Sequence, residues 1–579
     1  MEKRQIVETL LEITKLLEIE GANPFRIRAY ENAARALRGT TDDIGDRVEA
    51  GTLSELQGIG KGLAEAIETL YRTGTLELHR ELKESFPPGV LELAQIDGLG
   101  AKRLRVLVKE EGIATPESLE DACLEGRVAE LPGFGEKTQA NILRSLEELA
   151  RYRERHLLSD ALRLADRLRD HLAESGWTAH VAGSVRRARE TVGDLDFVLA
   201  VPGEEREEVA EQLQSHPEVE RTVAAGETKV TIRVVGGWQV DFRLVEDEEL
   251  PSALHHFTGS KEHNIQIRGR AKDRGLLVNE YGLFRGEERL SLEDEEDLFR
   301  VLDLAFVPPE LREGDGEIEA AEQGAIPVLV EVGDCRGTFH VHTDWSDGTA
   351  SLRVMAEAAR DRGWEYLGIA DHSRAAGYAG GLSPEELREQ GRAIRELNRG
   401  WDDFRLFHGV ECDILVDGRL DLPDEILSEL DYVVVSVHSR LDLPGPEMTR
   451  RVTEALENPY VTMLGHPTGR LLLRREASEL DLDAVLARAE ALGVLVEVNA
   501  SPRRLDLDWR HLRGWLRAGN LTSINPDAHD PSSLDFVRYG VAVARKAWAT
   551  PGEILNCLPL AKVEEFLRDH RRRRVEGSE

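Results

Sequence analysis

The sequence predicts a multidomain protein in which a helical amino-terminal region precedes an α+β domain and then an α/β domain. The chain has 579 residues, more than one hydrophobic core normally organises. Amphipathic helical spacing dominates the first 150 residues, and strand-like runs mixed with helices follow. Beyond about residue 335, apolar runs alternate with helical patterns, which is typical of parallel strands.

The composition is that of a globular intracellular protein. Apolar residues make up 41% and charged residues 32%, and no apolar run approaches the roughly 20 residues of a membrane span. The sequence does not start like a signal peptide, so we expect a cytoplasmic chain without membrane contact. The four cysteines are far apart and form no CxxC pair, which argues against a disulfide framework or a thiolate zinc site.

The net charge of −35 argues at first against a nucleic-acid partner, because phosphate neutralisation favours a basic surface. Total charge does not fix local fields, however, and part of the acidity lies in residues 287–297, which we interpret as a solvated face. Any contact with DNA must then come from basic patches or from backbone amides.

The amino-terminal region contains three similar glycine turns. They lie in residues 56–61, 96–102 and 131–137, each followed by a helical pattern. A Gly-apolar-Gly turn leaves N–H groups free at a helix start, where the helix dipole favours an anion such as a DNA phosphate. A single copy is more often a plain helix connection, but three copies resemble helix-hairpin-helix elements. The expected DNA contacts are Gly58, Gly60, Lys61, Gly98, Gly100, Lys102, Gly133, Gly135 and Lys137.

The α+β region carries three acidic residues on predicted strands. Residues 192–201 read as one strand, and residues 230–235 and 239–245 form a hairpin candidate joined at Gly236 and Gly237. Asp194 and Asp196 are two apart and face the same side, and Asp241 is the natural third ligand. An Asp-x-Asp pair alone is usually a solvated strand end, whereas three such oxygen ligands suit Mg²⁺.

This stretch resembles the palm of family X DNA polymerases, the family of DNA polymerase beta. The resemblance rests on the Gly183-Ser184 turn, the Gly193-Asp194-x-Asp196 pair and Asp241. It implies a nucleotidyltransferase palm in which the three aspartates bind two Mg²⁺ or Mn²⁺ ions and Asp241 helps to activate the primer 3′-hydroxyl. Ser184, Arg187 and the Gly193 amide would hold the β and γ phosphates of a deoxynucleoside triphosphate.

The next segment extends the resemblance. His256-Phe257-Thr258-Gly259-Ser260, with Asn264 and Arg268 downstream, matches the family's Tyr-Phe-Thr-Gly-Ser run except for the histidine. The match implies that His256, Phe257 and Gly259 shape the sugar pocket. It also implies that Asn264 meets the incoming base and that Arg268 reaches the template.

The amino-terminal residues 25–34 and the first glycine turn resemble a small domain that in some relatives removes a 5′-deoxyribose phosphate through a lysine imine. Ala66 stands where that lysine should be, and alanine has no amine. We therefore expect no lyase activity by this route. Lys61 lies nearby, and we interpret it as a phosphate contact.

The carboxy-terminal half places histidines and acids after apolar strand-like runs. Strand ends on one rim of a parallel barrel converge, so distant residues can share one ligand shell. A single histidine is more often a surface residue than a ligand, but the clustering favours a site for Zn²⁺, Mn²⁺ or Fe²⁺. The nine candidates are His340, His342, Asp347, His372, Glu411, His438, His466, Asp527 and His529.

The set is similar to the site of polymerase-and-histidinol-phosphatase (PHP) phosphoesterases, and every position of that pattern is occupied here. The similarity implies a barrel-like α/β domain of the distorted TIM kind and up to three metal ions. It also implies an active phosphoesterase.

The order of parts resembles bacterial and archaeal family X polymerases over nearly the whole chain. This implies a monomeric, nucleoid-associated repair enzyme that fills gaps in primed or gapped DNA and trims 3′ ends as a 3′–5′ exonuclease or phosphoesterase. Two alternatives are a small-molecule phosphatase with an unrelated DNA-binding front end and a non-catalytic DNA scaffold. The three aspartates and the Phe-Thr-Gly-Ser segment argue against the first, and the complete ligand sets argue against the second.

The expected boundaries follow from these motifs. They are a helical DNA-binding domain at 1–80, further helix-hairpin-helix repeats at 81–150, the palm at 151–250, a nascent-base-pair-binding subdomain at 251–315, a linker at 316–335 and the PHP domain at 336–579.

Overall fold

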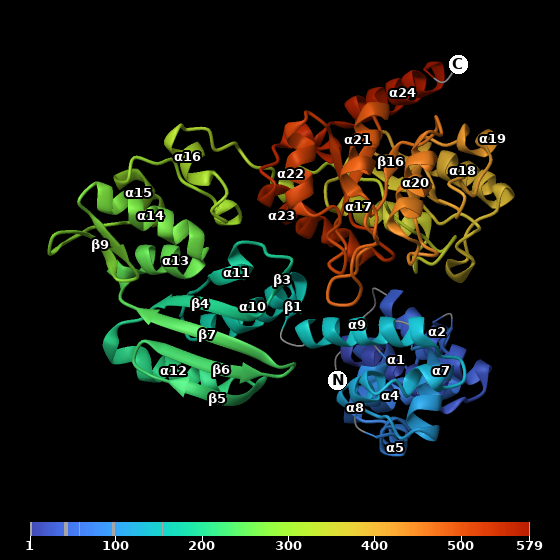
Figure 1. Ribbon diagram of the computed structural model, residues 1–579, viewed down its shortest axis with the longest axis horizontal. Coiled ribbons are helices and arrows are strands. Elements are labelled where there is room, and N and C mark those ends of the chain that lie inside the picture. Colours follow the sequence, from blue (N-terminus) through green and yellow to red (C-terminus); the bar gives the residue numbers. More distant parts are fainter. Residues whose placement is uncertain are drawn as a thin grey trace.

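The computed structural model describes residues 3–39, 44–56, 58–87, 89–94, 96, 99–152 and 155–577. Figure 1 shows the amino-terminal helices below the carboxy-terminal α/β domain, with the α+β sheet to the left, beyond the end of the long helix α9 (Glu136–Tyr152). Within those ranges, no helix combines the length and apolar character needed to cross a membrane.

The amino-terminal region is entirely helical in its described residues. Its helices are α1 (Lys3–Glu20), α2 (Pro24–Gly39), α3 (Ile44–Ala50), α4 (Lys61–Thr73), α5 (Glu77–Ser85), α6 (Val90–Leu93), α7 (Ala101–Arg105), α8 (Pro116–Leu124) and α9 (Glu136–Tyr152). Helix α1 contributes to two hydrophobic cores. Ile6 and Leu10 pack with residues of α2 and α4, whereas Ile13 and Leu17 pack with residues 82–146. The two helical units therefore share α1.

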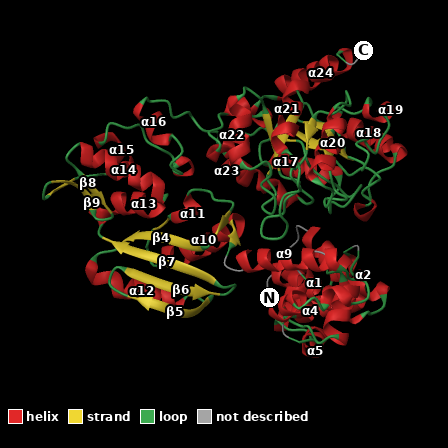
Figure 2. Ribbon diagram, viewed as in Figure 1, coloured by secondary structure: helices red, strands yellow, loops and turns green. Residues whose placement is uncertain are grey.

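A five-stranded sheet forms the centre of the α+β domain (Figure 2). The strands of this domain are β1 (His156–Leu157), β2 (Ala179–Val181), β3 (Thr191–Val192), β4 (Asp194–Ala200), β5 (Val219–Ala225), β6 (Lys229–Val234) and β7 (Trp238–Val245), and the helices are α10 (Leu158–Ala173), α11 (Gly183–Arg186) and α12 (Arg206–Ser215). The sheet order is β2-β4-β7-β6-β5, with β4 parallel to β7. Strands β6 and β7 pair antiparallel across Gly236 and Gly237, so the predicted hairpin is confirmed.

A small subdomain follows the sheet. It contains α13 (Leu250–Thr258), α14 (Lys261–Asp273), α15 (Glu295–Val301), α16 (Glu317–Glu322), β8 (Leu277–Asn279), β9 (Gly282–Arg285) and β10 (Glu288–Leu290). In Figure 1 it lies above the sheet and to the left of the carboxy-terminal domain. Residues 316–335, expected as a linker, contain α16. Its Ile318 packs in the hydrophobic core of this subdomain. Further along the same stretch, the Val330 N–H donates a hydrogen bond to the Ala549 carbonyl at 2.9 Å, which joins the stretch to the carboxy-terminal domain.

One acidic residue of the 287–297 run departs from the expected solvated face. Glu295 is buried and pairs with Arg186 at 2.8 Å and with Arg312 at 2.5 Å. Burial raises the pKa of Glu295, but the guanidinium groups of Arg312 and Arg186 outweigh it and hold that pKa at about 2. The interpretation as a solvated face is wrong for Glu295, because two cations compensate its burial.

The carboxy-terminal domain is built on parallel strands. They are β11 (Gly337–Thr338), β12 (Tyr366–Ile369), β13 (Arg405–His408), β14 (Glu411–Asp413), β15 (Val434–Ser436), β16 (Met463–Leu464), β17 (Leu495–Asn499) and β18 (Thr522–Asn525). The order is β11-β12-β13 in one sheet and β14-β15-β16-β17-β18 in the other. A parallel bridge between Val341 and Ala528, just beyond β11 and β18, brings the two ends of the strand series together.

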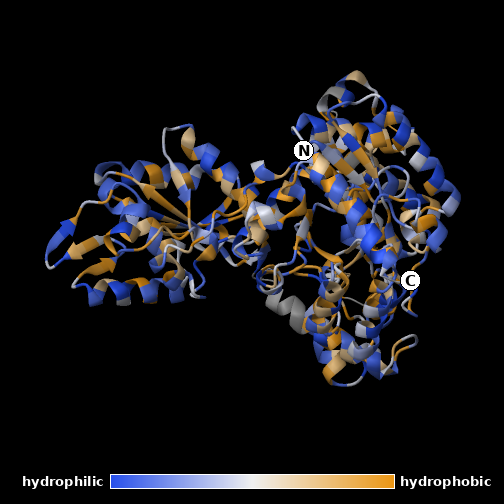
Figure 3. Ribbon diagram, turned by 90° about the horizontal axis from the view of Figure 1, so that it is seen from above, coloured by the Kyte–Doolittle hydropathy of each residue, from blue (hydrophilic) through white to orange (hydrophobic). Residues whose placement is uncertain are grey.

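Helices surround these strands. They are α17 (Leu352–Asp361), α18 (Pro384–Asn398), α19 (Asp424–Leu427), α20 (Gly445–Leu456), α21 (Leu482–Leu492), α22 (Trp509–Arg517), α23 (Val537–Lys546) and α24 (Leu560–Glu576). Figure 3 shows hydrophobic residues concentrated along the strands and polar residues on the outward faces of the helices. The predicted alternation of parallel strands and helices is confirmed, except that no helix separates β13 from β14.

Candidate functional site

The three aspartates of the α+β domain share one face of the sheet. Strands β4 and β7 run parallel with Asp196 directly opposite Asp241, and Asp194 precedes Asp196 by two residues. Their neighbours Leu195 and Val240 are buried, so alternation turns the three carboxylates to the opposite, partly exposed side. The structure thus brings together the three predicted ligands.

The electrostatics of this face suit a divalent cation. Burial and the carboxylates of Asp194 and Asp241 raise the pKa of Asp196 to about 7. Asp241 accepts hydrogen bonds from Lys229 Nζ at 2.8 Å and from Thr231 Oγ1 at 2.6 Å, which fix its orientation. Carboxylate oxygens are the ligands that Mg²⁺ and Mn²⁺ prefer, and a bound cation would relieve the repulsion among the three aspartates.

The glycine-serine turn lies against one of these aspartates. Gly183 begins the short helix α11 at φ +59°, and a Cβ there would lie 2.1 Å from Asp196 Oδ2. Only glycine fits this approach. Ser184 follows in the same turn, and Gly193 is exposed directly before β4.

Arg187 is held at the edge of this site by groups distant in sequence. Its Nε lies 3.3 Å from Glu313 Oε1, and its guanidinium also donates to the carbonyl of Thr258. The backbone carbonyl of Arg187 accepts from Lys546 Nζ at 3.0 Å. The sequence reasoning missed Glu313 and Lys546 because neither belongs to a local motif.

The remaining predicted nucleotide contacts lie on α13 and α14. The ring of Phe257 packs under Arg243 and lies 5.0 Å from the ring of His256. Asn264 Nδ2 donates to His256 O at 2.8 Å, and Arg268, exposed, donates from Nε to Asn264 O at 3.2 Å. Four of the predicted residues are therefore linked by contacts, two of which are made to backbone carbonyls.

Gly259 ends α13 at φ +68° and lies close to Arg187. A Cβ at Gly259 would lie 3.1 Å from Arg187 Nη1, so this glycine leaves room for the guanidinium.

The glycine turns of the amino-terminal region lie at helix starts. Gly60 precedes α4, Gly100 precedes α7 and Gly135 precedes α9. The first two are the amino-terminal caps of their helices. Of the others, Gly58 and Gly133 have positive φ, Lys61, Lys102 and Lys137 are exposed, and Gly98 lies outside the described residues.

The nine predicted ligands of the carboxy-terminal half gather in one cluster at the strand ends. The described residues offer three groups that could each hold an ion, namely His342 with Asp347, His372 and His529, His340 with His342 and Asp527, and His372 with Glu411 and His438. His466 adjoins the third group, with Nε2 2.9 Å from Glu411 Oε1. The prediction that these residues come together is thus met in the geometry.

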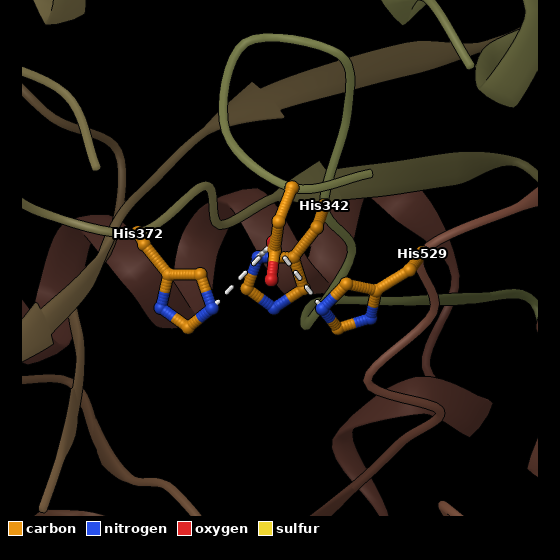
Figure 4. Close-up of side chains that lie close together, drawn as sticks. His342, His372 and His529 are labelled. Carbon is orange, nitrogen blue, oxygen red and sulfur yellow. Dashed lines mark ion pairs between the residues drawn. The ribbon is translucent and has the colours of Figure 1, made fainter. Parts of the chain in front are cut away.

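Figure 4 shows the imidazoles of His342, His372 and His529 directed toward a common point. The carboxylate oxygen Oδ1 of Asp347 lies 3.9, 3.6 and 3.3 Å from nitrogens of these three rings. Asp527 is placed similarly, with Oδ1 3.2 Å from His342 Nε2 and 3.8 Å from His340 Nε2.

Glu411 is the central acid. Burial raises its pKa, but the imidazoles of His438, His340 and His372 outweigh it and hold that pKa well below its usual range. Several buried ring nitrogens have no hydrogen-bond partner, among them His340 Nε2, both nitrogens of His342, and His466 Nδ1. Unpartnered imidazole nitrogens beside buried carboxylates fit divalent metal ions, since isolated buried polar atoms are costly.

Two acids that the sequence reasoning missed orient the ligands. Glu497 Oε2 lies 2.9 Å from His340 Nδ1, and Asp413 Oδ1 lies 3.1 Å from His438 Nδ1. Such partners fix the ring orientation and tautomer of a ligating histidine. The available signal was a glutamate inside an otherwise apolar strand run, residues 494–498.

Asp371 supports the site from outside the ligand set. It accepts hydrogen bonds from the Thr343 backbone at 2.7 Å and from Ser346 Oγ at 2.5 Å, and so holds the segment between His342 and Asp347. Arg504 is the only lysine or arginine, within the described part of the chain, that pairs with one of the nine ligands, at 3.5 Å from Asp527 Oδ2.

Backbone strain marks the same cluster. His466 has φ +26° and Asp527 has φ +53°, values that residues other than glycine rarely adopt. Such conformations cost roughly 1–3 kcal/mol and persist where the surrounding structure enforces them.

Comparison with known proteins identifies three regions. Residues 253–313 match the DNA polymerase beta thumb, residues 1–76 a helix-hairpin-helix domain, and residues 90–148 a SAM-like helix-hairpin-helix tandem.

Among curated proteins, the chain is 39% identical to the DNA polymerase/3'-5' exonuclease PolX of Bacillus subtilis over 577 residues, 98% of this chain and 100% of that protein. A "probable phosphatase" of Caldicellulosiruptor saccharolyticus is 30% identical over 244 residues, 40% of this chain and 95% of that protein. One of Thermoanaerobacter sp. is 28% identical over 196 residues, 32% of this chain and 77% of that protein.

Among solved structures, a ternary complex of Leishmania infantum polymerase beta matches with 25% identity and a TM-score of 0.26, covering 39% of this chain and 97% of that one.

Proposed function

The chain belongs to the family of the DNA polymerase/3'-5' exonuclease PolX, and we propose that it fills gaps in DNA during repair and processes 3′ ends with its carboxy-terminal PHP half. The observation that carries the proposal is the presence of two separate acid-containing clusters in one chain, Asp194–Asp196–Asp241 and the nine residues around Glu411. Separate clusters allow synthesis and hydrolysis to proceed at different sites.

We assign the polymerase reaction to the face shared by β4 and β7. When bound, two Mg²⁺ or Mn²⁺ ions would supply the charge that stabilises in-line attack on a nucleoside triphosphate. The three aspartates would hold these ions, and Asp241 is assigned to activation of the primer 3′-hydroxyl. The turn at Gly183 and Ser184, with the Gly193 amide and Arg187, is assigned to the β and γ phosphates of the deoxynucleoside triphosphate.

The subdomain after the sheet would contact sugar, base and template. We assign His256, Phe257 and Gly259 to the sugar pocket, Asn264 to the incoming base and Arg268 to the templating strand. The hydrogen bond from Asn264 Nδ2 to the His256 carbonyl supports this, because the residues proposed for the base and for the sugar are then neighbours.

The amino-terminal turns are assigned to gapped or primed DNA. Their backbone amides and exposed lysines would bind phosphates without a net basic surface. The proposed contacts are those at Gly58, Gly60, Lys61, Gly98, Gly100, Lys102, Gly133, Gly135 and Lys137.

We assign 3′–5′ exonuclease and phosphoesterase activity to the carboxy-terminal cluster. When bound, up to three Mn²⁺, Zn²⁺ or Fe²⁺ ions would supply the charge that activates water and stabilises the leaving oxygen. Glu411, Asp347 and Asp527 bring the carboxylates and the histidines the imidazoles, with Glu497 and Asp413 orienting two of the rings.

No 5′-deoxyribose phosphate lyase activity is proposed. Ala66 is buried in α4 and has no amine, and Lys61 stands at the exposed start of the same helix. That position suits a phosphate contact.

The proposed domains are those of the sequence analysis, residues 1–80, 81–150, 151–250, 251–315, 316–335 and 336–579. We further propose a monomer in the cytoplasm at the nucleoid, because both clusters are complete within one chain and the substrate is DNA.

The test is primer extension and primer degradation on gapped DNA by the wild type, Asp241→Ala and His342→Ala. Asp241→Ala should lose synthesis only, and His342→Ala should lose degradation only. Loss of both activities in either variant would contradict two independent sites.

The likeness to probable phosphatases favours a second candidate, phosphomonoesterase activity at the carboxy-terminal cluster. Phosphate release from histidinol phosphate, measured beside nucleotide release from a primer, separates the two. Faster hydrolysis of the small molecule would favour the second candidate.

A further inference from the structure

A lysine of the carboxy-terminal domain reaches into the edge of the polymerase site. Lys546, the last residue of α23, has a fully buried side chain. Its Nζ donates to Arg187 O at 3.0 Å, to Glu310 O at 3.2 Å and to Glu313 Oε1 at 2.5 Å. An ammonium group has three donors, so these contacts satisfy it and fix its position.

Glu313 is surrounded by three cations. Its Oε1 lies 2.5 Å from Lys546 Nζ and 3.3 Å from Arg187 Nε, and its Oε2 lies 3.1 Å from Arg189 Nη1. The Glu313 side chain is only 12% exposed, so water screens its charge poorly. Lys546 and Arg187 share one carboxylate oxygen, which makes the strength of each contact depend on the other.

Arg187 is the residue assigned above to the triphosphate. A carboxylate beside that arginine acts against nucleotide binding in two ways, because it draws the guanidinium away and because it repels the phosphates. Lys546 counters both effects, because its ammonium neutralises the Glu313 carboxylate and holds it in place.

We propose that Lys546 is a positioning residue of the polymerase site: by holding Glu313, it keeps Arg187 available to the incoming triphosphate. Nucleotide binding thereby depends on a side chain of the PHP domain. The inference rests on the proposed function, in which Arg187 binds the triphosphate. Lys546 itself does not contact the substrate.

The test is the steady-state kinetics of nucleotide addition to gapped DNA by Lys546→Met, which keeps the buried volume and removes the charge. We expect KM for the nucleotide to rise roughly tenfold, the size of an ordinary coupling between sites, with kcat little changed. Degradation of 3′ ends by the same preparation should stay at the wild-type rate, since the carboxy-terminal cluster is untouched.

Arg545→Met is the matched control. Arg545 is the neighbouring residue of α23 and crosses the same interface, with Nε 2.7 Å from Glu310 Oε1 and Nη1 3.0 Å from Val330 O. These bonds do not involve Arg187 or Glu313, so replacing Arg545 should leave the nucleotide KM unchanged. A rise equal to that of Lys546→Met would mean that the interface as a whole matters, and would overturn the role of Lys546.

Glu313→Gln separates positioning from general stability. Without the carboxylate there is no charge for Lys546 to neutralise, so Lys546→Met should have little effect on KM in the Glu313→Gln background. Glu313→Gln alone should leave KM unchanged or lower it, and this holds as a test even where Lys546→Met does not fold. A higher KM in Glu313→Gln, or no rescue in the double variant, would overturn the proposal.

The outcomes for the wild type keep the two proposals apart. A wild-type chain that adds no nucleotide to gapped DNA refutes the proposed function. A wild-type chain that extends the primer, with an unchanged KM in folded Lys546→Met, refutes only the role of Lys546.

Discussion

His340 and Glu497 form a fully buried pair, with His340 Nδ1 2.9 Å from Glu497 Oε2. The same oxygen accepts from Asn525 Nδ2 at 2.8 Å, and Oε1 accepts from the His466 backbone N–H at 2.7 Å, so both oxygens of the carboxylate are held. The pair turns His340 Nε2 toward the centre of the cluster, where that nitrogen has no hydrogen-bond partner.

Glu497→Gln should therefore lower 3′-end degradation roughly 10- to 100-fold, because loss of a carboxylate behind a ligating histidine weakens metal binding by that factor. Synthesis should be unchanged. The measurement is degradation of a labelled primer as a function of Mn²⁺ concentration. Glu490→Gln, an exposed change on α21, is the control, and an equal loss in both variants would refute the role of Glu497.

Gly183→Ala should abolish most synthesis while sparing degradation. The new Cβ would meet Asp196 Oδ2, and displacement of a catalytic group by about 1 Å costs about 100-fold in rate. Gly237→Ala is the matched control, because Gly237 also has positive φ, +80°, but nothing within 4 Å of an added Cβ. Comparable losses of primer extension in both variants would show that backbone strain, and not contact with Asp196, is responsible.

The buried pair of Glu295 and Arg312 should make the stability of the subdomain depend on pH. The pKa of Glu295 lies at about 2 in the folded protein against an ordinary 4.5. A depressed pKa contributes stability that is fully present above pH 4.5 and is lost as pH falls toward 2, roughly 3 kcal/mol in total. Thermal unfolding at pH 7 and pH 3 should show this loss in the wild type.

Glu295→Gln should be less stable at pH 7 and should show a flatter dependence on pH. Glu296→Gln, an exposed neighbour, should behave like the wild type. An unchanged pH profile in Glu295→Gln would contradict the assignment of the acid-sensitive stability to this residue.

Metal ions should stabilise the carboxy-terminal domain. A ligand present at 100 times its Kd stabilises the folded state by about 2.7 kcal/mol, so adding Mn²⁺ to the chelator-treated protein should raise the melting temperature. His342→Ala should show a smaller rise, because His342 takes part in two of the three groups. Asp241→Ala should keep most of the Mn²⁺-induced rise in melting temperature, measured by calorimetry. If Asp241→Ala loses that rise, the stabilising ions bind at the polymerase site instead.

The sequence was sufficient to predict that the nine candidate ligands gather in one cluster, because they follow apolar strand runs. His372, His438 and His466 each come shortly after such a run, and parallel strands bring those ends to one edge. Similarly, the period of two placed Asp194 and Asp196 on one face, and the hairpin at Gly236 and Gly237 fixed the strand that carries Asp241.

Contacts between distant segments were beyond the reach of the sequence. Glu313 lies 126 residues from Arg187, and Lys546 lies a further 233 residues along, so no spacing rule connects them. Glu295 was misread for the same reason, because its partner Arg312 belongs to a later turn. Local patterns predict faces and ends of elements, whereas tertiary packing decides which charges are buried together.

The sharing of α1 between two helical cores limits how the proposed DNA contacts can be mapped by deletion. A chain shortened to begin at residue 81 would lack Ile13 and Leu17, and the second core would open to water at that side. Weaker DNA binding by such a fragment would then report unfolding as much as a missing turn. Substituting Lys61, Lys102 or Lys137 one at a time leaves both cores filled. Such single substitutions are the way to measure how much each of the three turns contributes to DNA affinity.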